Sequence, residues 1–253
     1  MKQKSLFFIF LFLCVSFLVA QEEQKSNRFR INVDYGIASV TSNLKGNWSV
    51  RQDVESYDYR DGGNSLSYNA WLMSCGVKPE YQLLNDKLGI LTGIQYLRTM
   101  SNLSKDNTYF YLRYKQEGAN TEFARIKRVE ECSNYIGIPV ELKYHLAYRE
   151  GVSLFVRIGT DFNFKMNSDI RADFVNDLMK EREHEILDNI DVSTKSFYST
   201  FYYSVGLRMG QKGKIGVNAE LVLPSIYLTS NNFAIVDPQN FWGARVSLEI
   251  PVK

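Results

Sequence analysis

One stretch, Tyr135–Leu146, limits what this chain can fold into. Its even positions, from Ile136 to Leu146, are all large and apolar, whereas its odd positions from Gly137 to His145 are small, polar or charged. This period-two alternation predicts a β-strand with one apolar and one charged face. A tilted strand crosses a bilayer in about 9–11 residues, which this stretch matches. Glu141 and Lys143 would be out of place against lipid but not inside a barrel.

The chain opens with a segment that resembles a secretory signal peptide. Lys2 and Lys4 precede the apolar run Leu6–Leu18, and Val19-Ala20 provides a small-residue exit before Gln21. We therefore expect a signal peptide at residues 1–20, a short periplasmic segment at 21–27 and one barrel domain at 28–253. Cys14 raises the alternative of a lipoprotein signal, but no small residue precedes it.

Charge and cysteine content bear on nucleic-acid binding and on disulfide formation. The full chain has 30 Lys and Arg residues and 28 Asp and Glu residues. Removal of the signal peptide takes away Lys2 and Lys4, so 28 residues of each sign remain. A chain with this balanced charge gives no indication of a nucleic-acid partner. Cys75 and Cys132 remain in the exported chain, which suggests a disulfide. Both fall on lipid-side positions of strands that are not neighbours, so we expect two free thiols.

The same alternation recurs along the chain and predicts eight strands. They are Arg28–Val40, Tyr68–Leu84, Leu88–Met100, Phe123–Leu146, Val152–Phe164, Ser196–Met209, Ile215–Tyr227 and Phe241–Val252. In the third strand, Leu91 and Leu97 interrupt the pattern because they fall on lumen-side positions. Short turns are expected at Asn85–Lys87, Tyr148–Gly151 and Gln211–Lys214, and long loops at Thr41–Ser67, Ser101–Glu122, Lys165–Lys195 and Thr229–Asn240.

Long and short connections alternate strictly, as in outer-membrane barrels, which have short periplasmic turns and longer extracellular loops. With both termini periplasmic, the chain is predicted to be all-β: an eight-stranded antiparallel transmembrane β-barrel with a filled lumen and four long extracellular loops. A soluble sandwich would not need so regular a pattern. A lipocalin-like soluble barrel is the main alternative, and it would turn the apolar face inward and the charged face outward.

The chain resembles the PorT-like outer-membrane β-barrel-domain family of Gram-negative bacteria. The segments that carry the resemblance are RINVDYGIA, YIGIPVELKY, LFVRIGTDFNF and FWGARVSLEI, and the most distinctive positions are Ile138, Pro139, Lys143 and Tyr144. The resemblance implies the barrel fold and an outer-membrane location. It implies no catalytic residues, and since some members act in protein secretion, it leaves the role of this chain open.

Twelve charged residues are predicted to line the lumen. They are Arg30, Asp34, Lys78, Glu80, Glu141, Lys143, Arg157, Asp161, Arg208, Glu220, Arg245 and Glu249. The interior of a barrel of about eight strands is just filled by its side chains, so these charges are expected to pair as a structural plug. The alternative interpretation is a narrow path for ions.

The third long loop carries a distinctive pattern. Ile170, Phe174, Leu178, Ile186 and Ile190 recur at four-residue multiples between acidic and basic residues, which favours one amphipathic helical stripe that docks a partner. The acidic residues raise the alternative of cation binding, but no calcium-loop motif is present and no metal or cofactor is expected.

Catalysis is not expected. The two histidines, His145 near a short turn and His184 in the third long loop, are predicted to lie too far apart to act together. We therefore expect a non-enzymatic outer-membrane scaffold or accessory subunit that acts through its extracellular loops in protein secretion or surface assembly. The alternatives are a porin-like channel for small solutes and a lipid-modifying enzyme centred on His145. Expected partners are the outer-membrane bilayer and another outer-membrane or secretion protein.

Overall fold

The computed structural model covers most of the predicted barrel domain. The described residues are 28–45, 50–51, 66–105, 108–117, 120–149, 151–188, 194–211, 213–229 and 232–252. The predicted signal peptide (1–20), the segment 21–27, most of the first long loop and Ile190 lie outside these residues.

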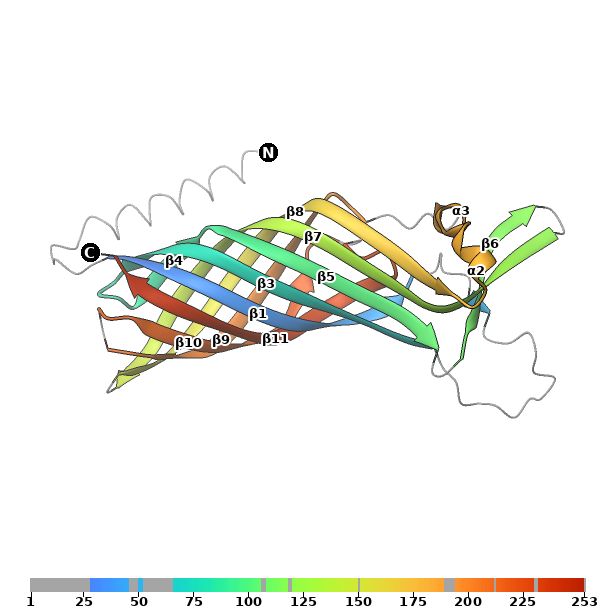
Figure 1. Cartoon of the computed structure of the whole chain (residues 1–253). Coiled ribbons are helices and arrows are strands. Elements are labelled where there is room, and N and C mark those ends of the chain that lie inside the picture. Colours follow the sequence, from blue (N-terminus) through green and yellow to red (C-terminus); the bar gives the residue numbers. More distant parts are fainter. Residues whose placement is uncertain are drawn as a thin grey trace, which may run out of the picture.

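The strands form one closed antiparallel ring (Figure 1). The ring has eight strand positions, which we call staves, because β4 and β5 together occupy one of them. The ring consists of β1 (Phe29–Leu44), β3 (Leu66–Leu83), β4 (Leu88–Thr92) with β5 (Ile94–Lys105), β7 (Asn120–Arg149), β8 (Val152–Phe174), β9 (Phe197–Met209), β10 (Gly216–Tyr227) and β11 (Val236–Pro251). Strand β1 pairs with β11 from Arg30–Pro251 to Leu44–Val236, which closes the ring. The predicted fold class is confirmed.

Strands β4 and β5 are two halves of one stave, because both pair with β3 on one side and β7 on the other. They are separated at Gly93, where a Cβ atom would lie 2.2 Å from the carbonyl oxygen of Val77. Leu91 and Leu97 are buried in this stave, so the irregular alternation predicted there is real.

The ring is apolar outside and polar inside. On β7 the outward side chains of Ile136, Ile138 and Leu142 are exposed, whereas the inward Glu141 and Lys143 are buried. This polarity is the reverse of a soluble lipocalin-like barrel, so that alternative is wrong. Within the described part of the chain, no helix is long and apolar enough to span a bilayer.

At one end of the ring, the turn end, the connections are short. Leu84, Asn85 and Asp86 have φ values of 52°, 56° and 65°, and Gly151 and Gly213 also have positive φ. These left-handed residues allow tight reversals. Strand β1 begins and β11 ends here, with the amide of Val252 donating to the carbonyl of Phe29 at 3.0 Å.

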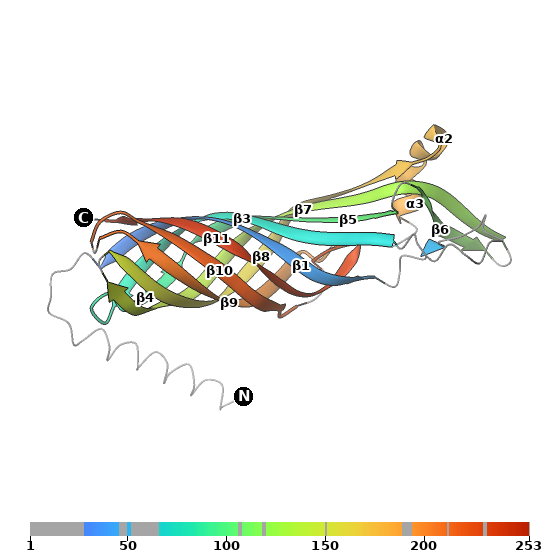
Figure 2. The same ribbon diagram turned by 90° about the horizontal axis from the view of Figure 1, so that it is seen from below.

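At the other end, the extended end, several strands continue well past the ring (Figure 2). The predicted loop 101–122 is wrong in large part, since β5 reaches Lys105 and β6 (Phe110–Glu117) pairs with the start of β7. A two-residue strand, β2 (Val50–Arg51), pairs with β6. Sequence reasoning treated polar residues here as loop signals, although polar strands are stable where both faces meet water or protein.

The predicted helical stripe in the third loop is also wrong. Strand β8 continues through Ile170 to Phe174, and only then follow the short helices α2 (Asp177–Lys180) and α3 (Glu183–Asp188). The physical reason is that Ile170 and Phe174 are four residues apart, a spacing that fits one face of a strand through Ala172 as well as one face of a helix.

A buried apolar cluster continues from the ring interior into the extended end. Among its fully buried members are Phe110 and Leu112 of β6, Ile126 and Val129 of β7 and Ile186 of α3. The extensions therefore form a packed structure beyond the ring.

Cys75 and Cys132, the cysteines within the described residues, are free, as predicted. Cys75 lies on β3 and Cys132 on β7, and the stave formed by β4 and β5 separates these strands.

Candidate functional site

All twelve predicted lumen charges lie in the interior, each with at most 8% of its surface exposed. Six are basic and six acidic. They come from β1, β3, β7, β8, β9, β10 and β11, where they occupy alternate positions along strands whose outer faces are apolar, and the stave of β4 and β5 contributes none of the twelve.

Glu249 is the centre of the ion pairs nearest the turn end. Its carboxylate accepts hydrogen bonds from Lys143 Nζ at 2.8 Å and from Arg208 Nε at 2.8 Å, and it also pairs with Arg30. Glu80 lies beside this group, with its Oε2 3.8 Å from Lys143 Nζ. One carboxylate thus pairs with three cations, and we call these four residues the Glu249 cluster.

Glu141 is the centre of a second group in the middle of the lumen, the Glu141 cluster. It accepts from Arg157 at 2.7 Å and Arg245 at 3.1 Å, and it also pairs with Lys78. Asp34 Oδ2 lies 2.6 Å from Lys78 Nζ.

Two further side chains complete the Glu141 cluster. Glu220 Oε1 lies 3.3 Å from Arg157 Nη2, and the Tyr202 hydroxyl donates to Glu141. Phe155 lies between the two clusters, with its ring centroid 4.8 Å from Lys143 Nζ and 5.7 Å from Arg157 Cζ.

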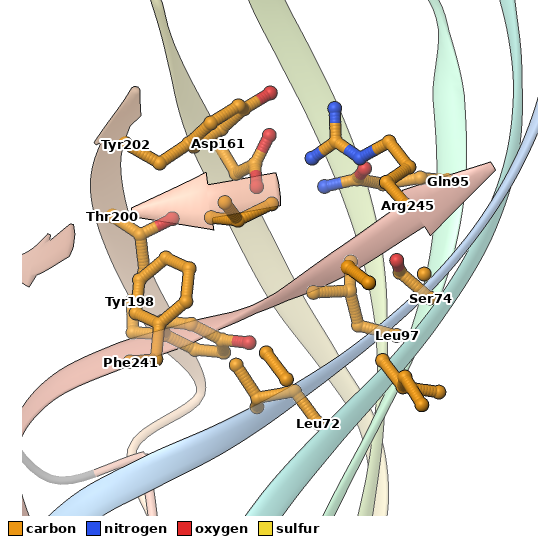
Figure 3. Close-up of a pocket in the computed structure, with 15 residues that line it drawn as sticks. Leu72, Ser74, Gln95, Leu97, Asp161, Tyr198, Thr200, Tyr202, Phe241 and Arg245 are labelled. Carbon is orange, nitrogen blue, oxygen red and sulfur yellow. The ribbon is translucent and has the colours of Figure 1, made fainter. Parts of the chain in front are cut away.

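Asp161 differs from the other eleven charges. Within the described residues no Lys, Arg or His nitrogen lies within 4.0 Å of its carboxylate, and its Oδ1 atom has no hydrogen-bond partner. It lines a cavity of about 40 Å³ together with Gln95, Thr200, Tyr202 and Arg245 (Figure 3). That volume holds roughly one or two water molecules, and buried polar atoms without protein partners are the usual hosts of ordered water.

A segment that sequence reasoning missed lies on the extended side of this cavity. Residues 232–236, which lead into β11, are fully buried or nearly so. The Glu131 carboxylate accepts the amides of Ala234 at 2.7 Å and Ile235 at 3.3 Å, as well as the hydroxyl of Ser101 at 2.7 Å. The Tyr135 hydroxyl donates to the carbonyl of Asn232 at 3.0 Å. We call residues 232–236 the strap.

Glu131 lies beyond the apolar belt, since its neighbours Arg128 and Glu130 are exposed and charged. Burial raises the pKa of its carboxyl above the usual value, although hydrogen bonds from the strap and Ser101 oppose this. The signal for this site was present in the sequence, because Glu131 continues the inward series of Tyr135 and Ser133.

The residues predicted to dock a partner are mostly packed. Ile186 is buried, Ile170 and Phe174 pack partly buried against the apolar cluster, and Leu178 is 71% exposed. Ile190 lies outside the described residues. The structure therefore leaves Leu178 as the exposed member of the set.

The two histidines lie far apart in the chain and make separate contacts. His145 Nδ1 lies 2.7 Å from Ser153 Oγ, and His184 Nδ1 lies 3.1 Å from Asp188 Oδ2 on the exposed face of α3. His145 Nε2 has no hydrogen-bond partner in the described part of the chain, so no carboxylate orients the ring as a catalytic triad requires. The described residues also contain no group of three His, Cys, Asp or Glu side chains that would hold a metal ion.

The sequence matches the family described as Outer membrane protein beta-barrel domain over residues 8–248. The chain belongs to this family. As a member of the Outer membrane protein beta-barrel domain family, the protein is located in the outer membrane, with the apolar outside of its ring against lipid. No curated protein matches the chain.

Several solved structures resemble this family member at low identity. Ail of Yersinia pestis, in complex with the heparin analogue sucrose octasulfate, is 11% identical over 88% of this chain and 99% of that chain, with a TM-score of 0.33. OprG of Pseudomonas aeruginosa is 9% identical over 88% and 96%, with a TM-score of 0.37. The transport unit of the autotransporter AIDA-I of Escherichia coli is 7% identical over 91% and 92%, with a TM-score of 0.31. At these TM-scores the likeness carries no argument about function.

Proposed function

We propose that this protein is a non-enzymatic outer-membrane scaffold, an accessory subunit that binds another protein through its extended end. The observation that carries the proposal is the part of the apolar cluster that β6, β7, β8 and α3 contribute, which continues from the ring interior into the extended end. A barrel that only spans the membrane needs no such structure, since strands that cross the bilayer are about 9–11 residues long. Strand β7 has 30 residues.

The filled lumen supports the same proposal. Two clusters of buried ion pairs and the strap occupy the interior, so the ring supplies an anchor and the extended end supplies the contact surface. In this proposal the extended end faces outward, both termini are periplasmic and residues 1–20 are a cleaved signal peptide. The resemblance to PorT-like proteins favours protein secretion or surface assembly as the process.

The test is purification of the tagged full chain from its own outer membrane in mild detergent, with mass spectrometry of bound proteins. We expect one stoichiometric partner. A variant in which the exposed Val175 and Leu178 are replaced by Ser loses it, because exposed apolar side chains at the extended end form the contact. A matched control replaces the exposed Lys180 and Glu181 by Ser and keeps the partner. A wild-type protein that elutes alone contradicts the proposal.

A small-solute channel is the second candidate, and the cavity beside Asp161 favours it. A carboxylate in the lumen whose oxygen has no hydrogen-bond partner could bind a cation that passes along a pore. Discrete conductance in planar bilayers that changes on neutralising Asp161 or Arg157 would replace the scaffold proposal by this one.

A lipid-modifying enzyme is the third candidate, favoured by the 2.7 Å contact between His145 and Ser153. The fully buried Ser153 and the missing third group argue against it. Unchanged membrane lipids in a His145→Ala strain would remove this candidate.

A further inference from the structure

A groove of about 730 Å³ lies on the outside of the barrel wall, over β1, β10 and β11. None of its eleven lining residues is charged. Its large apolar members, among them Ile37, Leu221 and Trp242, are exposed on the outer face of the ring. The groove is therefore part of the surface that faces lipid.

The register of the strands explains one half of the groove. Ala244 of β11 lies opposite Ile37 of β1 and opposite Leu221 of β10. A small side chain thus lies between two large ones in one row across the wall, and this leaves a dent.

The next row toward the extended end repeats the arrangement. Ser39 of β1 lies opposite Trp242 of β11 on one side and Trp71 of β3 on the other. The dent over Ser39 adjoins the dent over Ala244, so the two form one groove bordered by two indole rings.

The backbone fixes the depth and one side of the groove. A Cβ atom on Gly243 would lie 2.1 Å from the carbonyl oxygen of Ile37, so only glycine allows β11 to approach β1 this closely. On β10 the register shifts between Val222 and Ser225, and this bulge carries Leu223 and Pro224 at the groove's side. Such a bulge is a fixed feature of the wall.

We propose that this groove binds one acyl chain of a membrane lipid. Lipid tails are as apolar as the protein surface, so a chain gains little hydrophobic free energy by binding, and packing contacts decide occupancy. A chain in the groove contacts a floor and two sides, whereas a chain on the flat wall contacts one face. The volume falls within the range of about 300–1,000 Å³ that is typical of small-molecule sites.

The position of the groove indicates which leaflet supplies the lipid. Toward the turn end the outward residues of β1 are Tyr35 and Val33, and toward the extended end Thr41 is polar. Trp71 and Trp242 thus lie near the boundary of the apolar belt, where tryptophan is enriched in membrane proteins. The chain comes from the leaflet beside the extended end, which is the outer leaflet in the orientation proposed above. The bound chain depends on the barrel and not on the scaffold role, and only the assignment to the outer leaflet rests on the proposed orientation.

Native mass spectrometry of the full chain, released from phospholipid vesicles in mild detergent, tests the proposal. We expect one retained phospholipid. In an Ala244→Leu variant the retained fraction falls at least about fivefold, since filling the floor removes on the order of ten atom contacts. The matched control is Ala219→Leu on β10, an outward alanine between Val246 and Leu207, and it keeps the lipid. Ser39→Leu fills the second dent and serves as an independent variant if Ala244→Leu does not fold.

Indole fluorescence locates the bound chain. All variants carry Trp48→Phe, so that Trp71 and Trp242 are the remaining indoles. We expect phospholipids brominated on their acyl chains to quench the fluorescence of these two residues. Adding Ala244→Leu reduces the quenching, whereas adding Ala219→Leu does not. Equal lipid retention by both variants, or none by the wild type, would overturn the proposal. A dimer that Ala244→Leu dissociates would also overturn it, because a second barrel would then fill the groove.

Discussion

Glu141 and Asp161 are both buried lumen carboxylates on neighbouring strands, yet they have different surroundings. Glu141 accepts from Arg157 and Arg245 and pairs with Lys78, while Asp161 has no cation within ion-pair distance in the described part of the chain. Alternation in the sequence predicted that both side chains point inward. It did not predict which charges meet, because pairs such as Lys143–Glu249 are 106 positions apart and depend on how the closed ring staggers its strands.

This contrast gives a matched pair of substitutions. Glu141→Gln leaves three buried cations without their shared charge and destabilises the protein by about 3–5 kcal/mol. Asp161→Asn removes a buried charge that forms no ion pair within the described residues, and stability stays within about 1 kcal/mol or rises. Urea titration of folding into lipid vesicles measures both. A larger loss for Asp161→Asn than for Glu141→Gln would contradict the described pairing.

Glu131 gives a prediction about pH. Because burial raises the pKa of its carboxyl in the folded protein, the folded state holds this proton more tightly than the unfolded state. The contribution of Glu131 to stability is therefore greatest below its unfolded value of 4.5 and declines as pH rises through the higher folded value. Hydrogen exchange of the Ala234 and Ile235 amides, corrected for intrinsic rates, measures the effect. A Glu131→Gln variant keeps an acceptor for both amides and loses the pH dependence, whereas an equal dependence in that variant would assign it to another group.

At the scale of elements, the membrane-spanning parts of the strands were predictable and their extensions were not. Tyr135–Leu146 alternates because one face meets lipid and the other the lumen, and β7 contains it entire. Beyond the lipid that contrast ends, so β6 and the start of β7 resembled a polar loop. Ile170 and Phe174 show a second cause, since a four-residue spacing fits a strand as well as a helix.

The two short helices allow a comparison between a buried side chain, Ile186 of α3, and an exposed one, Leu178 of α2. Ile186→Ala removes a buried side chain from the apolar cluster and lowers the local stability of the extended end by about 2–5 kcal/mol. Leu178→Ala changes an exposed side chain and stays within about 0.5 kcal/mol. Protease cleavage rates in the segment from α2 to β9 report both effects. Similar rates in the two variants would show that α3 does not pack as described.

For the whole molecule, the filling of the lumen bears on whether ions can pass. Side chains of the Glu249 cluster, Phe155, the Glu141 cluster and the strap succeed one another from the turn end to the extended end. We therefore expect purified protein in planar bilayers to give no discrete conductance steps at a protein load where a general porin does. Steps that respond to Asp161→Asn would instead establish a conducting path.

The position of Glu249 in the chain has a consequence for biogenesis. This residue lies on the last strand, yet it pairs with Arg30 of the first strand as well as with Lys143 and Arg208. A nascent barrel that lacks β11 leaves these three cations facing one another without Glu249. The carboxylate that these three cations share thus comes from the last strand of the chain, so their ion pairs form only when β11 pairs with β1 and closes the ring.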